Sequence, residues 1–147
     1  MILLDGSKGE GGGQIVRTAL ALSSLTGKPF RVTNIRQGRR DPGLKPQHVH
    51  CITALQELCK AKAEGAYEGS RELLFVPGPI AAKNLTIDIG TAGSITLLLQ
   101  AVLLPCMFAQ KNHTLTLKGG TDTEWSMPVD YFTNVLNCVV LYQLTKP

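Results

Sequence analysis

The sequence predicts a mixed α/β (α+β) fold in which one module of strands and helices occurs twice. Short segments with an apolar residue at every second position alternate with longer segments whose apolar residues recur every three or four positions. These are the patterns of strands and amphipathic helices. The order strand, helix, strand, helix, strand runs once from the start, and a similar order begins again near residue 85. Asp5 and Asp88 end the first strand of each run, 83 residues apart (88 − 5). Such repetition is typical of modules packed side by side.

The first half of the first module reads as strand, helix and strand. Residues 2–4 are a short apolar strand, and residues 15–25 carry the apolar recurrence of a helix. Gly27 closes this helix, because glycine readily adopts the left-handed conformation in which many helices end. Residues 30–32 alternate again and predict the second strand.

The second half of the first module begins with a loop over residues 38–46 that is rich in glycine, proline and arginine. A helix is expected from Pro46, since proline is favoured in the first helical turn. Its apolar stripe consists of Val49, Ile52, Leu55 and Leu58. Residues 73–76 predict one more strand, which the following Pro-Gly-Pro sequence ends.

The second module repeats this order. Residues 85–89 alternate as a strand, Thr91–Ser94 lead into an apolar helix, and residues 115–117 alternate as the next strand. A last helix is expected from Pro128, with an apolar stripe of Val129, Phe132, Leu136 and Val140.

The modules define two units, residues 1–80 and residues 81–147. The second unit is incomplete, because nothing after Val140 corresponds to the strand at 73–76. A unit without its closing strand leaves a sheet edge open. We therefore expect the chain to be a fragment or a truncated product, and the open edge also makes a homo-oligomer possible.

Composition narrows the class of protein. The net charge is +4, and cationic residues cluster between positions 31 and 45, with only Asp41 opposing them. This cluster favours a polyanionic partner, and a solvated basic loop is the alternative. The four cysteines form no C-x-x-C pair and lie in apolar helical patterns, which indicates reduced thiols and a cytoplasmic protein. The longest apolar run, residues 95–109, is too short to span a membrane.

The most informative segment is Gly9–Arg17, where three successive glycines lead directly into a helix. Glycine permits close approach of the backbone to a ligand, and a helix N-terminus favours anions such as phosphate. Gln14 and Arg17 share one helical face. The carboxylate of Glu10 stands beside this expected phosphate site, where a divalent metal could bridge the two. The alternative is a glycine-rich connector, and neither the P-loop nor the dinucleotide spacing fits.

Further candidate residues lie at the other strand ends. Arg36 and Arg39 follow a strand end, where ligands bind in α/β folds, and arginine donates two hydrogen bonds to phosphate at once. Gln47 and His48 open the next helix. Gln100 interrupts an apolar helix and is either a ligand contact or an amide satisfied by the protein itself.

The loop from Gly119 to Pro128 carries Asp122, Glu124 and Trp125. Its acidic residues suggest acid–base chemistry or, more simply, a solvated loop that caps the next helix. Trp125 could stack on a base, but we expect it to pack under the loop, as is common for tryptophan.

Together these segments resemble the RNA 3′-terminal phosphate cyclase family. The resemblance covers the chain to about Val135, in the family's order and spacing. It rests on Asp5-Gly6, Glu10–Arg17, Ile35–Arg39, Pro42–His48, Glu64–Ala66, Thr91–Ser94 and Gly119–Asp122.

The resemblance implies an activity. The family uses ATP and a divalent metal, Mg or Mn, to convert RNA 3′-phosphate ends to 2′,3′-cyclic phosphates. It does so through an enzyme–AMP adduct on a histidine and an adenylylated RNA end. The implied fold consists of repeated β-α-β-α-β-β units like the C-terminal domain of translation initiation factor 3, with a smaller inserted domain.

The resemblance also implies roles for individual residues. Glu10 matches the metal-binding glutamate. The phosphate-binding side chains match Arg17, Arg36, Arg39 and Gln47. Gln100 matches a nucleotide-site glutamine, and Pro128 falls where a proline packs on the adenine.

Two features of the family have no counterpart in this sequence. The nucleophilic histidine lies far downstream in the family, so no nucleophile is assigned, and we expect this chain alone to be inactive. The inserted domain and the third repeat are also missing. The alternative function is a non-catalytic RNA- or nucleotide-binding module, as in a cyclase relative that acts in ribosome assembly.

Overall fold

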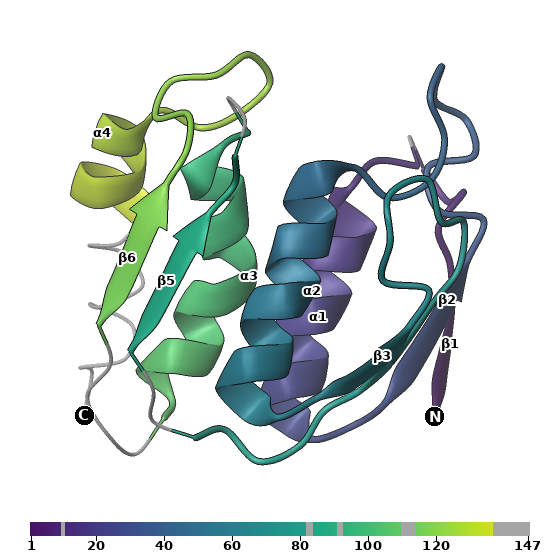
Figure 1. Cartoon of the computed structure of the whole chain (residues 1–147). Helices are drawn as coiled ribbons and strands as arrows, with labels where there is room; N and C mark the ends of the chain where they lie inside the picture. The colour runs from purple at the N-terminus through teal and green to yellow at the C-terminus, as the bar shows by residue number, and fades with distance from the viewer. Residues whose placement is uncertain (10, 82–83, 91–92, 110–113, 137–147) are drawn as a thin grey trace.

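The computed structural model of the 147-residue chain describes residues 1–9, 11–81, 84–90, 93–109 and 114–136. The described chain forms two sheets and three long helices, and the sheets lie on opposite sides of these helices (Figure 1). Two of these helices, α1 (Gln14–Thr26) and α2 (Pro46–Cys59), lie against the larger sheet, while α3 (Ile95–Met107) lies against the smaller one. Because α3 packs against both α1 and α2, one helical layer joins the two halves. The mixed α/β class is confirmed.

The larger sheet contains β1 (Ile2–Asp5), β2 (Phe30–Thr33), β3 (Lys62–Glu64) and β4 (Leu73–Val76), in the order β1-β2-β4-β3. The first two strands are parallel, as expected for strands joined by a helical crossover. The other two pairings are antiparallel. Over residues 2–76 the chain therefore follows the order β-α-β-α-β-β.

The core lies between this sheet and the helices. Phe30 and Phe75 are fully buried side chains of neighbouring strands, with ring centroids 5.8 Å apart. Most of the stripes predicted for α1 and α2 is buried or half-buried as well, including the buried Leu20 and Leu55, whereas Leu22 of α1 is exposed. Gly27 ends α1 with φ 69°, which confirms its predicted role as a cap.

The smaller sheet pairs β5 (Leu85–Asp88) with β6 (Leu115–Lys118) in parallel. Between them runs α3, which Ser94 caps, since its Oγ accepts a hydrogen bond from Leu97 N (3.3 Å). A short helix, α4 (Val129–Tyr131), begins after Pro128 as predicted, and it continues as a π-helix, η1 (Phe132–Leu136).

The first strands of the two halves end in the same way. Asp5 Oδ1 accepts a hydrogen bond from Ser7 N (3.0 Å), and Asp88 Oδ1 accepts one from Gly90 N (2.9 Å). Both are turns in which an aspartate bonds the backbone two residues on. The two strand ends are thus structurally equivalent, although the division of the chain at residue 80 stays a prediction, as does the likeness to the initiation-factor domain.

Some features differ from expectation or lie beyond the described chain. The strand β3 was not predicted, because its two charged residues are exposed and its single alanine gives no apolar alternation. Val140 and the open edge expected after it fall outside the described residues. Cys51, Cys59 and Cys106 are free thiols, and Cys138 lies outside the described residues. No helix in the described part of the chain has the length and apolar character needed to cross a membrane.

Candidate anion-binding site

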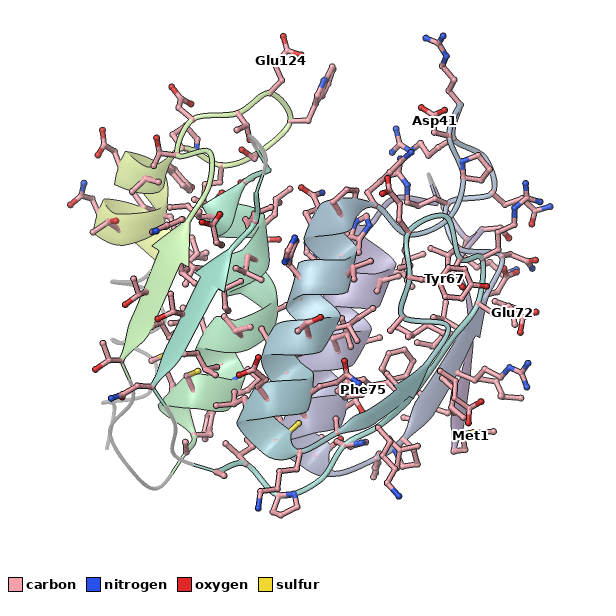
Figure 2. The ribbon with its side chains drawn as sticks, in the orientation of Figure 1. Met1, Asp41, Tyr67, Glu72, Phe75 and Glu124 are labelled. Carbon is pink, nitrogen blue, oxygen red and sulfur yellow. The ribbon has the colours of Figure 1, made fainter. Side chains whose placement is uncertain are left out.

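A cleft of about 900 Å³ lies where three helices begin. Gln14 begins α1, Gln47 lies in the first turn of α2 and Ser94 caps α3, and all three line the cleft. Figure 2 shows two loops rising at this end of the molecule, one carrying Glu124 and the other Asp41. Each helix N-terminus carries partial positive charge and unpaired N–H groups, so three of them around one cleft favour an anion.

The side chains of the cleft add to this positive charge. Among the described lining residues, Glu124 is the single acid, and the cations are Lys8, Arg17, Arg36, Arg39 and Lys45. Such an excess of one sign in a concave site concentrates the field and attracts ligands of the opposite charge. The cleft is therefore suited to a polyanion.

Arg17 is the most buried of these cations, with 7% of its surface exposed. Its Nη2 donates to Gln14 Oε1 (2.8 Å), and its Nε donates to Gln100 Oε1 (3.4 Å). Both partners are neutral, and no carboxylate of the described chain pairs with it. Burial lowers the pKa of Arg17, and the nearby Arg36 lowers it further. A buried guanidinium with no counter-ion is a natural site for a phosphate group.

Gln100 lies 83 positions after Arg17, which is the same spacing as that between Asp5 and Asp88. It is not one of the residues that line the cleft. Its side-chain oxygen instead accepts the hydrogen bond from Arg17 Nε. Among the described residues, Gln100 thus orients a cleft residue across the α1–α3 interface.

His48 is fully buried at the start of α2 and lines the cleft. Its Nδ1 accepts a hydrogen bond from Lys45 N (2.9 Å), as the third residue of a capping box does. Its Nε2 is buried and has no hydrogen-bond partner in the described structure. Burial lowers the pKa of His48 to about 3, and Arg17 and Arg36 lower it as well. The neutral ring therefore carries its proton on Nε2, as an unused donor.

Gly13 explains how His48 and Arg17 come so close to the start of α1. A Cβ atom at this position would overlap His48 Nε2 and lie 3.0 Å from Arg17 Nη1. Residue 13 must therefore be glycine for reasons of space, since its φ of −67° suits any residue. The glycines of the segment were predicted to allow close approach of a ligand, and Gly13 also makes room for these two side chains.

The loop that carries Arg36 and Arg39 is held at both ends. Ile35 and Leu44 are fully buried, Ile35 N donates to Arg71 O (3.0 Å), and Leu44 N donates to Ser70 O (2.9 Å). Arg36 has φ 56°, and its Nε is buried without a hydrogen-bond partner among the described residues. Both arginines line the cleft, so a fixed loop presents them there.

The far rim of the cleft differs from expectation. Trp125 lines the cleft and is 97% exposed, so the prediction that it packs under its loop is wrong. The turn around it is closed by hydrogen bonds between the polar residues Thr123 and Ser126.

The structure brings four predicted phosphate-binding residues together in the cleft, namely Arg17, Arg36, Arg39 and Gln47. Pro128 is exposed at the start of α4 and is not among the lining residues. Glu10 lies outside the described residues. Within the described ranges, no group of three His, Cys, Asp or Glu could hold a metal ion.

Among the lining residues, sequence reasoning gave Lys8 no role; it placed Lys45 in the basic cluster and His48 at a helix start, but gave neither a specific contact. Lys45 and His48 lie at the same helix start as Gln47, so the feature that predicted Gln47 as a phosphate ligand applies to them as well. The donor at His48 depends on its burial against Gly13, which a helical pattern does not reveal.

Known proteins resemble this chain along most of its length. Residues 8–143 match the profile of a family described as "RNA 3'-terminal phosphate cyclase". A protein of this name from Pyrococcus furiosus is 55% identical over 135 residues, which is 92% of this chain and 40% of the relative. The namesake from Archaeoglobus fulgidus is also 55% identical, over 92% of this chain and 41% of the relative. The one from Thermococcus sibiricus is 52% identical over 99% of this chain and 41% of the relative.

Proposed function

Because this chain belongs to the RNA 3′-terminal phosphate cyclase family, we propose that it forms the phosphate-binding part of an ATP-dependent RNA 3′-phosphate cyclase. The chain spans about 40% of the length of the curated relatives that it matches. The proposal therefore assigns binding and positioning to this chain and leaves the remaining chemistry to the whole protein.

The proposed reaction has three transfers. A histidine nitrogen takes AMP from ATP, and pyrophosphate leaves. An oxygen of the RNA 3′-phosphate then takes AMP from the histidine. Finally the terminal 2′-hydroxyl oxygen loses its proton and attacks the 3′-phosphorus, and AMP leaves. Each step moves a phosphoryl group, so catalysis depends on positioning and on neutralising charge.

In the proposed complex, phosphate oxygens lie against Arg17, Arg36 and Arg39. Gln47 and the helix N-termini donate further hydrogen bonds. The Nε2–H of His48 donates to one more phosphate oxygen and thereby gains the partner that it otherwise lacks.

None of the described histidines is proposed as the nucleophile. The lone pair of His48 Nδ1 already accepts the Lys45 N–H, and its Nε2 carries the proton, so neither nitrogen can attack phosphorus. His50 does not line the cleft, and His113 lies outside the described residues. We therefore expect no stable protein–AMP adduct when this chain alone is incubated with ATP and magnesium.

A divalent metal fits this site only in part. Mg²⁺ is commonly held by one or two carboxylates together with substrate phosphates, rather than by a full protein cage. The described residues offer no such cage. We propose that Glu10, next to the lining residue Gly11, supplies a carboxylate for Mg or Mn, which would neutralise phosphate charge when bound.

The observation that carries the proposal is the buried guanidinium of Arg17, which has no carboxylate partner among the described residues. Replacing it in Arg17→Met should weaken binding of ATP or inorganic triphosphate by roughly 10- to 100-fold, because a hydrogen bond to a charged group contributes about 1.5–3 kcal/mol. Isothermal titration calorimetry would measure this change. Arg31→Met is the matched control, because Arg31 pairs with Glu72 (2.6 Å) and does not line the cleft. Equal losses in both variants would show that only overall charge matters.

A further inference from the structure

Trp125 is the largest exposed apolar side chain at the rim of the cleft. It is 97% exposed, and it is the only tryptophan of the chain. Leaving a large aromatic ring in water forgoes the burial that usually stabilises it. Its neighbours in the sequence, Glu124 and Ser126, are polar, and most of the residues that line the cleft with it are polar or charged, unlike the apolar patches that mark protein interfaces.

The loop projects Trp125 in a defined way. The backbone of Trp125 has a φ of 62°, a left-handed conformation that is uncommon for a bulky residue. Ser126 Oγ donates to Thr123 O (2.8 Å) and lies 2.7 Å from Thr123 Oγ1, which closes the turn. Thr96 Oγ1 donates to Met127 O (2.8 Å) and ties the turn to the start of α3. The ring therefore stands on an anchored turn rather than on a free loop.

The chemistry around the ring indicates its ligand. Trp125 lines the same cleft as Arg36 and Arg39, which present cationic groups to it. A molecule that contacts both the arginines and Trp125 needs phosphate groups for the arginines and a flat aromatic group to stack on the indole. A nucleotide has both, and bases stack on aromatic side chains without regard to sequence.

We propose that Trp125 is a stacking platform for the base of a nucleotide whose phosphate groups lie against Arg36 and Arg39. This inference rests on the proposed function and adds a residue to it. The base can belong to the 3′ end of an RNA or to ATP, because both join a base to phosphate.

The single tryptophan provides a direct test in the full chain. Its fluorescence should be quenched, with saturation, by a 3′-phosphorylated oligoribonucleotide if the base comes from RNA, or by ATP if it comes from the nucleotide. Inorganic triphosphate and an abasic ribose phosphate should leave it unchanged. Binding of a dye-labelled oligonucleotide is followed in parallel by anisotropy. If RNA and ATP both bind but neither quenches the fluorescence of Trp125, the stacking role is overturned and the proposed function stays intact.

Variants separate stacking from electrostatic attraction. Trp125→Ala should weaken binding of the quenching ligand about tenfold, and Trp125→Phe should weaken it less. Neither should change how steeply affinity falls with salt, whereas Arg36→Met should make that dependence shallower. Tyr67→Ala is the control, because Tyr67 is 64% exposed and does not line the cleft. Unchanged affinity in Trp125→Ala would overturn the inference, and absence of any nucleotide binding by the wild type would contradict the proposed function as well.

Discussion

Arg17 and His48 are two buried polar side chains whose surroundings favour a bound anion. Within the part of the chain that the structure describes, Arg17 has only neutral partners and His48 has an unused N–H group. An unsatisfied buried donor costs about 1–3 kcal/mol, more where the group is charged. A phosphate in the cleft would supply the missing acceptor to His48 and a negative charge to Arg17, so binding would relieve a cost that the folded chain bears alone.

The burial of His48 predicts a dependence of stability on pH. Its folded pKa is about 3, below the ordinary value of 6.5, so the unfolded chain binds the proton more tightly. The contribution of the neutral, buried His48 to the free energy of unfolding is fully present above pH 6.5. It is lost as pH falls towards 3, at up to about 1.4 kcal/mol per pH unit. His48→Gln should flatten this part of the curve, because an amide does not titrate. Urea unfolding of both proteins at pH 4 to 7 measures this pH dependence. If the stability of His48→Gln fell as steeply with pH as that of the wild type, His48 would not be its source.

Gly13 predicts a steric effect on the same donor. In Gly13→Ala the new methyl group displaces the ring of His48 and crowds Arg17, so phosphate affinity should fall about tenfold or more. Gly12→Ala is the matched control, because a Cβ there would lie 3.6 Å from Arg39 Nη2, an ordinary contact. Triphosphate titration of both variants makes the comparison. Similar affinities for the two variants would mean that the glycines act only through flexibility.

At the scale of elements, the loop that carries Arg36 and Arg39 behaves as a fixed part of the site. Gly43 has φ 83°, and a Cβ there would overlap Gly69 O. Gly43→Ala should therefore destabilise the protein by roughly 1–3 kcal/mol and weaken triphosphate binding. Gly38→Ala in the same loop should be neutral or slightly stabilising, since a Cβ there meets open space. Denaturant unfolding of both variants tests this, and an equal loss of stability in both would contradict the anchored loop.

The main elements were predictable because their apolar periodicity reflects burial in the core between the sheet and the helices. α1, α2 and the alternating strands follow this rule. β3 does not, since its pairing with β4 is made by the backbone of three residues that carry little apolar surface. Arg36 and Arg39 were predictable from the loop that follows a strand end, and Arg17 from the helix that follows the three glycines. The orientation of His48 and the exposure of Trp125 were not, because each depends on close contacts within a folded turn.

At the scale of the whole molecule, both halves of the chain build the cleft. Residues 8–48 supply all five lysines and arginines that line it in the described chain, and residues 93–125 supply the start of α3 and the far rim. The Arg17–Gln100 hydrogen bond crosses the interface of α1 and α3. The packing of these helices therefore sets the position of the most buried cation.

Gln100→Leu tests this coupling. It should weaken triphosphate binding less than Arg17→Met does, because it leaves the guanidinium present but without its second partner. Adding Gln100→Leu to Arg17→Met should not weaken triphosphate binding further, because Gln100 acts by positioning Arg17. Gln56→Leu on α2 is the control for loss of a half-buried amide away from the cleft. Additive losses in the double variant would show that Gln100 acts independently of Arg17.

The measurement that tests the central claim most directly compares two RNA oligonucleotides that differ only at the 3′ end. Anisotropy of dye-labelled RNA ending in a 3′-phosphate or a 3′-hydroxyl gives both affinities at several salt concentrations. We predict that the 3′-phosphate binds at least about tenfold more tightly, and that Arg17→Met removes most of this preference. Equal affinity for the two ends would contradict the account, because the cleft would then attract RNA only as a general polyanion.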